Sequence, residues 1–287
     1  MMSYDFETIT HGKWILAGEH AVIRQHGALV FPLLEKQLIL QYRYSTIEVT
    51  TKTEGAQDHF ISDLLFKALK RGQALLHRQD ERLTGHFHLK STIPIGSGLG
   101  ASAALCVALA RWFEWSYGLN CSLFEFATQL EHLFHGQSSG LDIAGAMASS
   151  GLYFKAGHCT PIRQHWEPIW RLSASSHRGI TAECIQQVQT LWKTNPTRAE
   201  NIDQLMVESV TEAQAALENA SSNALPALAT AINKAETCFE QWGLINDDLR
   251  THIQELRSAG ALAAKPTGSG GGGYVISLWN DVSKYPF

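Results

Sequence analysis

The sequence predicts a globular protein that combines strands and helices in one large domain or two packed ones. Its 287 residues are enough to bury a substantial core, and hydrophobic residues make up 45% of the chain against 17% charged residues. Strand-like segments dominate the first 52 residues, whereas helical spacing continues from residue 181 to residue 258. We place a domain boundary within residues 150–165 and divide the chain into domains 1–158 and 159–287.

The local pattern of each segment predicts one element. Apolar or alternating β-branched runs predict strands at 13–16, 28–34, 37–44, 46–52, 86–89, 152–154, 169–172, 261–265 and 274–279. Apolar residues at helical spacing predict helices at 58–77, 101–117, 122–134 and 139–148, and over 181–258 with breaks near Asn195, Pro226 and Gly243. Ser122, with Glu125 three residues later, has the spacing of a capping box at a helix start.

Composition argues against several classes of protein. The net charge of -4, without a basic stripe, is unlike that of a nucleic-acid binder. No run approaches the roughly 20 apolar residues of a membrane span, and residues 1–10 do not resemble a signal peptide. The five cysteines are odd in number and form no C-x-x-C pair, which argues against a disulfide framework or a structural zinc site. We therefore expect a cytoplasmic protein that acts on a small molecule, not on nucleic acid or a membrane.

A glycine-rich turn, Pro94–Gly100, leads into the helix predicted at 101–117. Closely spaced glycines let the backbone approach a ligand, and the free N–H groups at a helix start bind phosphate. Ser102 falls in the first helical turn, where its hydroxyl could reach a phosphate or its metal ion. The turn has no P-loop lysine, and Ala101 stands where a dinucleotide fingerprint has glycine. Anion binding and an ordinary tight turn both remain open at this point.

Two acids, Glu131 and Asp142, flank a turn between two predicted helices. Phosphoryl transfer to an alcohol needs one carboxylate to orient the hydroxyl or accept its proton, and another to hold magnesium. The nearby His132 and His135 lack the His-Glu-x-x-His spacing of a zinc site. A solvated helix end is the alternative interpretation of this segment.

Four consecutive glycines, Gly270–Gly273, lie between two apolar, strand-like segments. Glycine loses more conformational entropy on folding than any other residue, so such a run is costly in an ordered region. A flexible linker does not fit strand-like flanks. A loop that lies flat against a ligand explains the run better.

Together with Gly12–Ile23 near the N-terminus, these segments resemble the three motifs of the galactokinase–homoserine kinase–mevalonate kinase–phosphomevalonate kinase (GHMP) family, in the family's order. The resemblance implies a two-domain α+β fold. Its N-terminal domain, 1–158, would bind ATP and contain a left-handed β-α-β unit. Its C-terminal domain, 159–287, would pair an antiparallel sheet with helices and be short at its end. The active site would lie in the cleft between the two domains.

The resemblance also implies a role for individual residues. Asp142 would be the catalytic carboxylate and Lys13 its partner, while Ser102 and Glu131 would hold Mg²⁺. Glu19 and His20 would line the acceptor pocket. The residues expected to contact ATP are Pro94, Gly96, Ser97, Gly98, Leu99, Gly100, Ala101, Ser102, Gly268, Gly270 and Gly271.

The acceptor is inferred from fewer residues. Lys13 with Gly18-Glu19-His20, and His135-Gly136 before Asp142, are similar to the mevalonate-kinase members of the family, which implies mevalonate as the substrate. In the third motif, Lys265-Pro266 resembles the corresponding residues of phosphomevalonate kinases as much. Another small-molecule kinase, a non-catalytic sensor and the related diphosphomevalonate decarboxylase are the further alternatives, and a homodimer is compatible with each.

Overall fold

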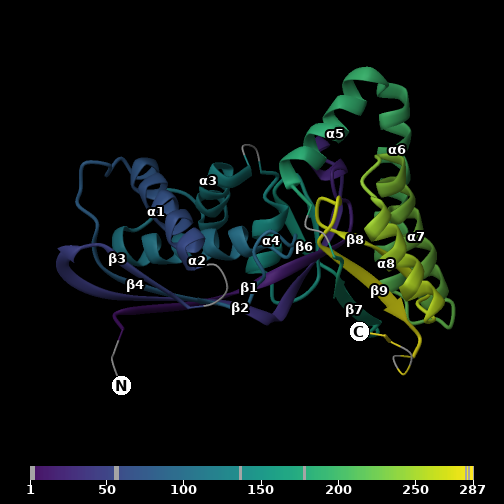
Figure 1. Cartoon of the computed structure of the whole chain (residues 1–287), viewed down its shortest axis with the longest axis horizontal. Helices are drawn as coiled ribbons and strands as arrows, with labels where there is room; N and C mark the ends of the chain where they lie inside the picture. The colour runs from purple at the N-terminus through teal and green to yellow at the C-terminus, as the bar shows by residue number, and fades with distance from the viewer. Residues whose placement is uncertain are drawn as a thin grey trace. The chain divides into compact units, whose positions relative to one another are not determined.

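The computed structural model describes residues 4–54, 58–135, 138–176, 179–281, 283 and 285–286 (Figure 1). Its elements follow the chain in this order: β1 (Phe6–Ala17), the 3-10 helix η1 (Ala21–Arg24), β2 (Ala28–Glu48), β3 (Thr50–Glu54), α1 (Asp58–Leu75), β4 (Thr84–Ser91), α2 (Ala101–Tyr117), α3 (Leu123–His135), α4 (Leu141–Met147), β5 (Leu152–Lys155), β6 (His158–Pro161), β7 (Ile169–Ala174), α5 (Thr181–Thr194), α6 (Pro196–Leu217), α7 (Ala224–Gln241), α8 (Asp247–Ser258), β8 (Ala263–Thr267) and β9 (Tyr274–Trp279).

The larger sheet has six strands in the order β3-β4-β2-β5-β6, with β1 also paired to β2. Strand β2 pairs antiparallel with β4 at one end, where Leu40 faces Leu89, and with β5 at the other, where Leu29 faces Tyr153. Strands β3 and β4 are parallel and are joined through α1, so they form a β-α-β unit. The smaller sheet is antiparallel, in the order β7-β9-β8.

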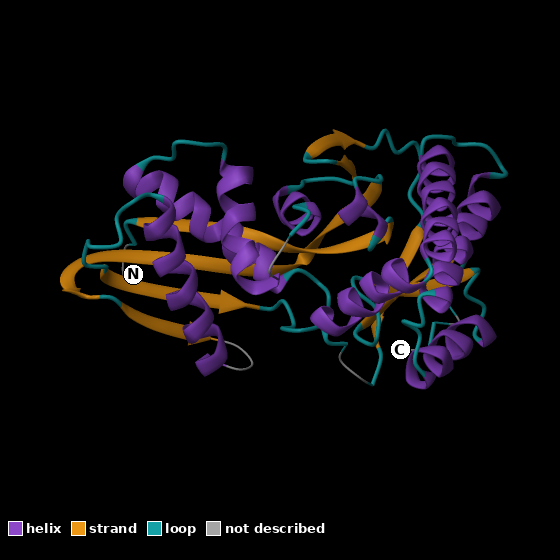
Figure 2. Ribbon diagram, turned by 90° about the horizontal axis from the view of Figure 1, so that it is seen from above, coloured by secondary structure: helices purple, strands orange, loops and turns teal. Residues whose placement is uncertain are grey.

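Contacts divide the chain into two compact units. Unit 1 comprises residues 1–13, 32–95 and 100–147, and unit 2 comprises residues 14–31, 96–99 and 148–287. In unit 1, helices α1, α2 and α3 lie over one face of the strands (Figure 1). Residues 103–110 of α2 are all buried, and this helix supplies Trp112 to an aromatic cluster with Tyr42 and Phe87. In unit 2, α6 and α7 pack along each other, and α7 and α8 pack against β8. Figure 1 labels these elements, and Figure 2 distinguishes helices from strands in a second view.

Several predicted elements are confirmed with their bounds or close to them. Helix α2 and strand β9 have the predicted limits, and α3 begins with the predicted capping box. The backbone N–H of Ser122 donates to Glu125 Oε2 at 3.0 Å, and the N–H of Glu125 donates to Ser122 Oγ at 3.2 Å. These features depend on residues close together in the sequence, which is why the local pattern sufficed.

Other predictions were wrong. The strands expected at 28–34 and 37–44 form the single strand β2, because the exposed Glu35 and the adjacent Lys36 continue the extended backbone instead of turning it. Strand β6 was missed because all four of its residues are exposed, so it has no apolar pattern. The break predicted near Pro226, by contrast, is confirmed, since α6 ends at Leu217 and α7 begins at Ala224. Pro226 itself lies in the first turn of α7, where its missing N–H costs no hydrogen bond.

Among the residues described, none of the helices combines the length and the apolar character needed to cross a membrane.

Candidate active site

In unit 1, Lys13 and Asp142 form an ion pair, with 2.8 Å between Lys13 Nζ and Asp142 Oδ1. Lys13 lies on β1 and is 1% exposed, whereas Asp142 lies in the first turn of α4 and is 32% exposed. The start of a helix favours a negative charge, so this position stabilises the carboxylate. The pair therefore fixes a carboxylate that solvent, or a ligand, can reach.

Gly100 at the start of α2 makes room for this lysine. Its φ of 80° is in the left-handed region, and a Cβ there would lie 2.7 Å from Lys13 Cγ. Any side chain at position 100 would therefore push the lysine aside. Ala101 and Ser102 follow in the first turn of α2, as predicted.

Glu131 on α3 is fully buried beside this pair. Its Oε2 accepts a hydrogen bond from Ser138 Oγ at 2.5 Å, and its Oε1 has no hydrogen-bond partner among the described residues. Burial raises the pKa of Glu131, and the negative charge of Asp142 raises it further. Ser138 and Lys13 act in the opposite direction but do not compensate. A buried carboxylate with one orphaned oxygen and a raised pKa is a position where a cation would be strongly stabilising.

In unit 2, the second and third motifs are in direct backbone contact. A Cβ on Gly98 would lie 3.1 Å from the carbonyl oxygen of Thr267, and one on Gly273 would lie 2.8 Å from the carbonyl oxygen of Ser97. A Cβ on Gly268 would lie 3.2 Å from the Cα of Gly98. The glycines are thus required because two stretches of backbone touch where no side chain would fit. Gly96, by contrast, has no atom of the described residues within 4 Å of its Cβ position.

The first and third motifs are joined by side-chain hydrogen bonds, also within unit 2. Thr267 Oγ1 accepts from the N–H of Ile15 at 2.8 Å and donates to its carbonyl oxygen at 3.0 Å. Lys265 Nζ donates to Glu19 Oε1 at 2.5 Å and to the Ile15 carbonyl oxygen at 3.4 Å. The sequence alone did not predict this contact, and Lys265 served there only to compare subfamilies. A single lysine in a short apolar strand before a glycine run is the signal that could have revealed it.

His20 is buried and uncharged. Its Nε2 lies 2.9 Å from the carbonyl oxygen of Ser269, and its ring meets Phe239 and Trp242 edge to face. A carbonyl oxygen only accepts, so Nε2 carries the proton of the neutral ring. Burial is the main cause that lowers the pKa of His20 to about 4.

The structure therefore groups the predicted residues by unit. Lys13, Glu131 and Asp142 come together in unit 1. Glu19 and His20, with exposed fractions of 3% and 6%, contact the third motif in unit 2. The backbone of His135 lies at the end of α3, and Gly136 lies outside the described residues.

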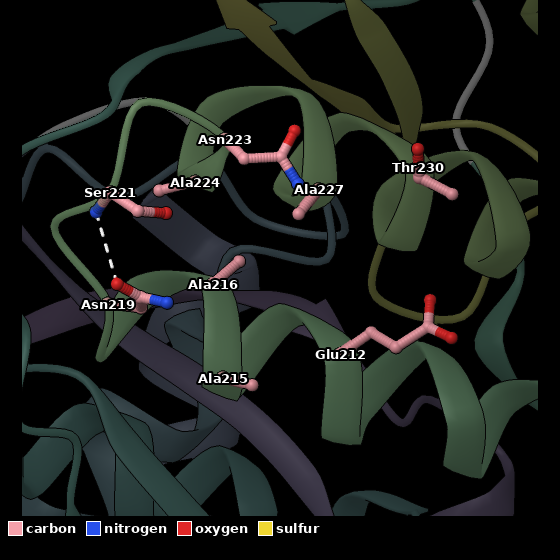
Figure 3. A pocket seen from close by; sticks show the side chains of 9 residues that line it. All are labelled: Glu212, Ala215, Ala216, Asn219, Ser221, Asn223, Ala224, Ala227 and Thr230. Atoms are coloured by element: carbon pink, nitrogen blue, oxygen red, sulfur yellow. Dashed lines mark hydrogen bonds between the residues drawn. The ribbon is translucent and has the colours of Figure 1, made fainter.

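A separate cavity of about 340 Å³ lies between the end of α6 and the start of α7 (Figure 3). Alanines and short polar side chains line most of it, including Asn219 and Thr230, and Glu212 stands at one side. None of the predicted site residues lines this cavity.

The burial of His20 predicts a loss of stability in acid. At pH 7 its ring is neutral in both the folded and the unfolded protein. Between pH 6.5 and about 4 the unfolded chain takes up a proton that the folded ring does not bind. The free energy of unfolding should therefore fall as the pH falls, by roughly 3 kcal/mol at pH 4 from this group.

Urea titrations of wild type and His20→Asn at several pH values measure this effect. The difference in their free energies of unfolding should shrink by roughly 3 kcal/mol from pH 7 to pH 4. The exposed His158 supplies the matched control, His158→Asn, in which a histidine outside the core is replaced. A constant difference for His20→Asn would contradict the neutral, buried ring.

Comparison with known families gives the class of this protein. A model described as the GHMP kinases N terminal domain matches residues 63–150, and one described as GHMP kinases C terminal matches residues 211–283. The chain belongs to the GHMP kinase family and has the two-domain fold of that family.

Within the family, the chain is similar to mevalonate kinases. A mevalonate kinase of Pyrococcus horikoshii is 28% identical to this chain, over 93% of this chain and 86% of the relative. The crystal structure of L. major mevalonate kinase in complex with R-mevalonate matches with a TM-score of 0.78 at 22% identity, over 99% of this chain and 91% of that one. S. pneumoniae phosphomevalonate kinase in complex with phosphomevalonate and AMPPNP matches with a TM-score of 0.76 at 19% identity, over 97% and 93%. The chain is a small-molecule kinase of the mevalonate kinase-like group.

Proposed function

We propose that this protein phosphorylates mevalonate with ATP and magnesium, forming 5-phosphomevalonate in the cytoplasm. The observation that carries the proposal is the ion pair of Lys13 with Asp142 beside the buried Glu131. These are the residue types that phosphoryl transfer to an alcohol requires. The similarity to proteins named mevalonate kinase supports the choice of acceptor.

Asp142 has the exposure and the fixed position of a residue that orients the acceptor hydroxyl. In the proposed reaction the hydroxyl oxygen forms a bond to the γ-phosphorus, and the bond from that phosphorus to the β,γ-bridging oxygen breaks, which leaves ADP. Asp142 accepts the hydroxyl proton. Lys13 holds Asp142 in place, and its positive charge offsets the charge that develops on the transferring group.

The donor set of unit 1 fits a magnesium ion. Glu131 presents an orphaned oxygen in a buried position, and Ser102 lies in the first turn of α2. No cluster of three acidic, histidine or cysteine side chains suited to a metal occurs in the described ranges, so Glu131 and Ser102 would be complemented by phosphate oxygens and water. When bound, the ion would offset the negative charge of the nucleotide phosphates.

ATP would bind at the glycine turn and the glycine loop. The positive φ values of Gly96, Gly98 and Gly100 shape a turn that leads into the start of α2, where free N–H groups attract phosphate. The backbone contacts of this turn with Gly268 and Gly273 support a role for the third motif in shaping the phosphate site.

A panel of acceptors tests the proposal. With ATP and magnesium, mevalonate should give a kcat/KM at least about tenfold higher than phosphomevalonate or galactose, because the positions lining the pocket resemble those of mevalonate kinases. ADP release measures turnover, and Asp142→Asn serves as the blank. Preference for phosphomevalonate would reassign the acceptor, and release of carbon dioxide with free phosphate would indicate the decarboxylase. Absence of ADP release with every alcohol would favour a sensor.

A further inference from the structure

Lys265 is a fully buried lysine that the proposed reaction does not use. It lies on β8 with no exposed surface, and its Nζ contacts Glu19, the Ile15 carbonyl oxygen and the ring of Phe239, whose centroid is 5.1 Å away. Burying a charge is costly, and a buried ion pair seldom stabilises a fold more than apolar residues of the same size would. Such a pair can instead fix one geometry, and here it joins the first motif to the third.

His20, the next residue of the first motif, also contacts the third motif. His20 follows Glu19 and has a φ of 59°, in the left-handed region, so its backbone is held in an uncommon conformation. From this position its ring donates to the carbonyl oxygen of Ser269, at the start of the glycine loop. The pair of Lys265 with Glu19 thus sets the position from which His20 reaches the loop.

The glycine loop, residues 268–273, is oriented by donors to its carbonyl oxygens. Besides Ser269, the carbonyl oxygens of three of its glycines accept bonds from protein side chains. These bonds join Cys184 Sγ to Gly270 at 3.3 Å, Asn246 Nδ2 to Gly271 at 3.1 Å and Ser175 Oγ to Gly273 at 2.9 Å. Carbonyl oxygens carry partial negative charge and repel phosphate. Holding them on protein donors therefore keeps this charge away from a bound anion.

We propose that Lys265 is a positioning residue for nucleotide binding. Its ion pair with Glu19 holds Glu19 and the adjacent His20 in place. The His20 ring in turn holds the carbonyl oxygen of Ser269, so that the glycine loop keeps the conformation that accepts the nucleotide phosphates. The inference rests on the proposed function, since it takes this loop to contact ATP. Its new content is that a buried ion pair sets the affinity for the nucleotide by fixing the backbone of the glycine loop.

Calorimetry with a non-hydrolysable ATP analogue and magnesium tests the role of Lys265. Lys265→Met keeps the length of the side chain but removes the ammonium group that donates to Glu19, and the Kd should rise about tenfold or more. Glu19→Gln should raise the Kd similarly. The increase in Kd for the double variant should be smaller than the product of the two single increases, because the residues act as one unit. The KM for ATP should rise more than the KM for the acceptor.

Glu236→Gln is the matched control. Glu236 on α7 belongs to another partly buried ion pair of unit 2, with 2.8 Å between Glu236 Oε2 and Arg257 Nη2. It is not one of the residues of the proposed site. This variant should lower the Tm and leave the Kd for the analogue unchanged. If Lys265→Met behaves in the same way, with a lower Tm and an unchanged Kd, Lys265 is only structural and the proposal is wrong. A change confined to the acceptor KM would also overturn it.

His20→Phe gives a second route if Lys265→Met does not fold. Phenylalanine keeps the ring contacts but cannot donate to Ser269, so the Kd should rise although the ion pair is intact, and an unchanged Kd would contradict the proposal. Because calorimetry needs no acceptor, a wild type that binds the analogue but does not phosphorylate mevalonate would refute the proposed function alone. A wild type that does not bind the analogue would refute both.

Discussion

Replacing Asp142 with asparagine should lower kcat by about 10²–10⁴-fold while the ATP analogue still binds. Asparagine keeps the size of the side chain but cannot accept a proton from the acceptor hydroxyl. The fold should survive because Asp142 is 32% exposed and lies at a helix start, where asparagine is tolerated. Steady-state turnover and calorimetry on the same preparation separate the chemical step from binding.

Lys13→Met should also be severely impaired, since the ion pair that fixes Asp142 is lost. The loss in the double variant should be smaller than the product of the two single losses, because both residues serve one step. Glu125→Gln, which changes an exposed carboxylate of α3 in the same unit, controls for general effects on the fold. An Asp142→Asn variant that keeps more than about a tenth of wild-type kcat would exclude Asp142 as the general base.

Replacing Glu131 with glutamine should raise the magnesium concentration needed for half-maximal activity by an order of magnitude or more, since a charged ligand is lost. The structure also predicts that magnesium binding depends on pH. Burial and the charge of Asp142 raise the pKa of Glu131, so the metal-free protein retains a proton that magnesium must displace. Magnesium should therefore bind wild type more tightly as the pH rises through neutrality.

In Glu131→Gln there is no proton to displace at this position, so this part of the pH dependence should be absent. Magnesium titrations of activity at several pH values measure it, again with Glu125→Gln as the matched control. The same raised pKa predicts that metal-free wild type loses stability as the pH rises above 4.5, because the folded state holds the proton more tightly than the unfolded chain does. Unchanged titrations in Glu131→Gln would reduce Glu131 to a structural residue.

Features that depend on neighbouring residues were predictable from the sequence. The bounds of α2 and β9, the capping box of α3 and the glycine turns with positive φ were all predictable, because periodicity, capping and turn geometry are encoded within a few positions. The order of the three motifs also allowed the family to be named, and the family models confirm it. The roles assigned to single residues stay predictions.

The pairing and the burial of charges that lie far apart in the sequence depend on how the chain folds. Lys13 pairs with Asp142, and Lys265 pairs with Glu19 at a separation of 246 residues, which no local pattern encodes. Burial likewise depends on the path of the whole chain, and it makes Lys265 a core residue, His20 a neutral ring and Glu131 a carboxylate with a raised pKa. The sequence supplied these side chains, and the fold set their charge states because desolvation and pairing act only once distant segments have packed together.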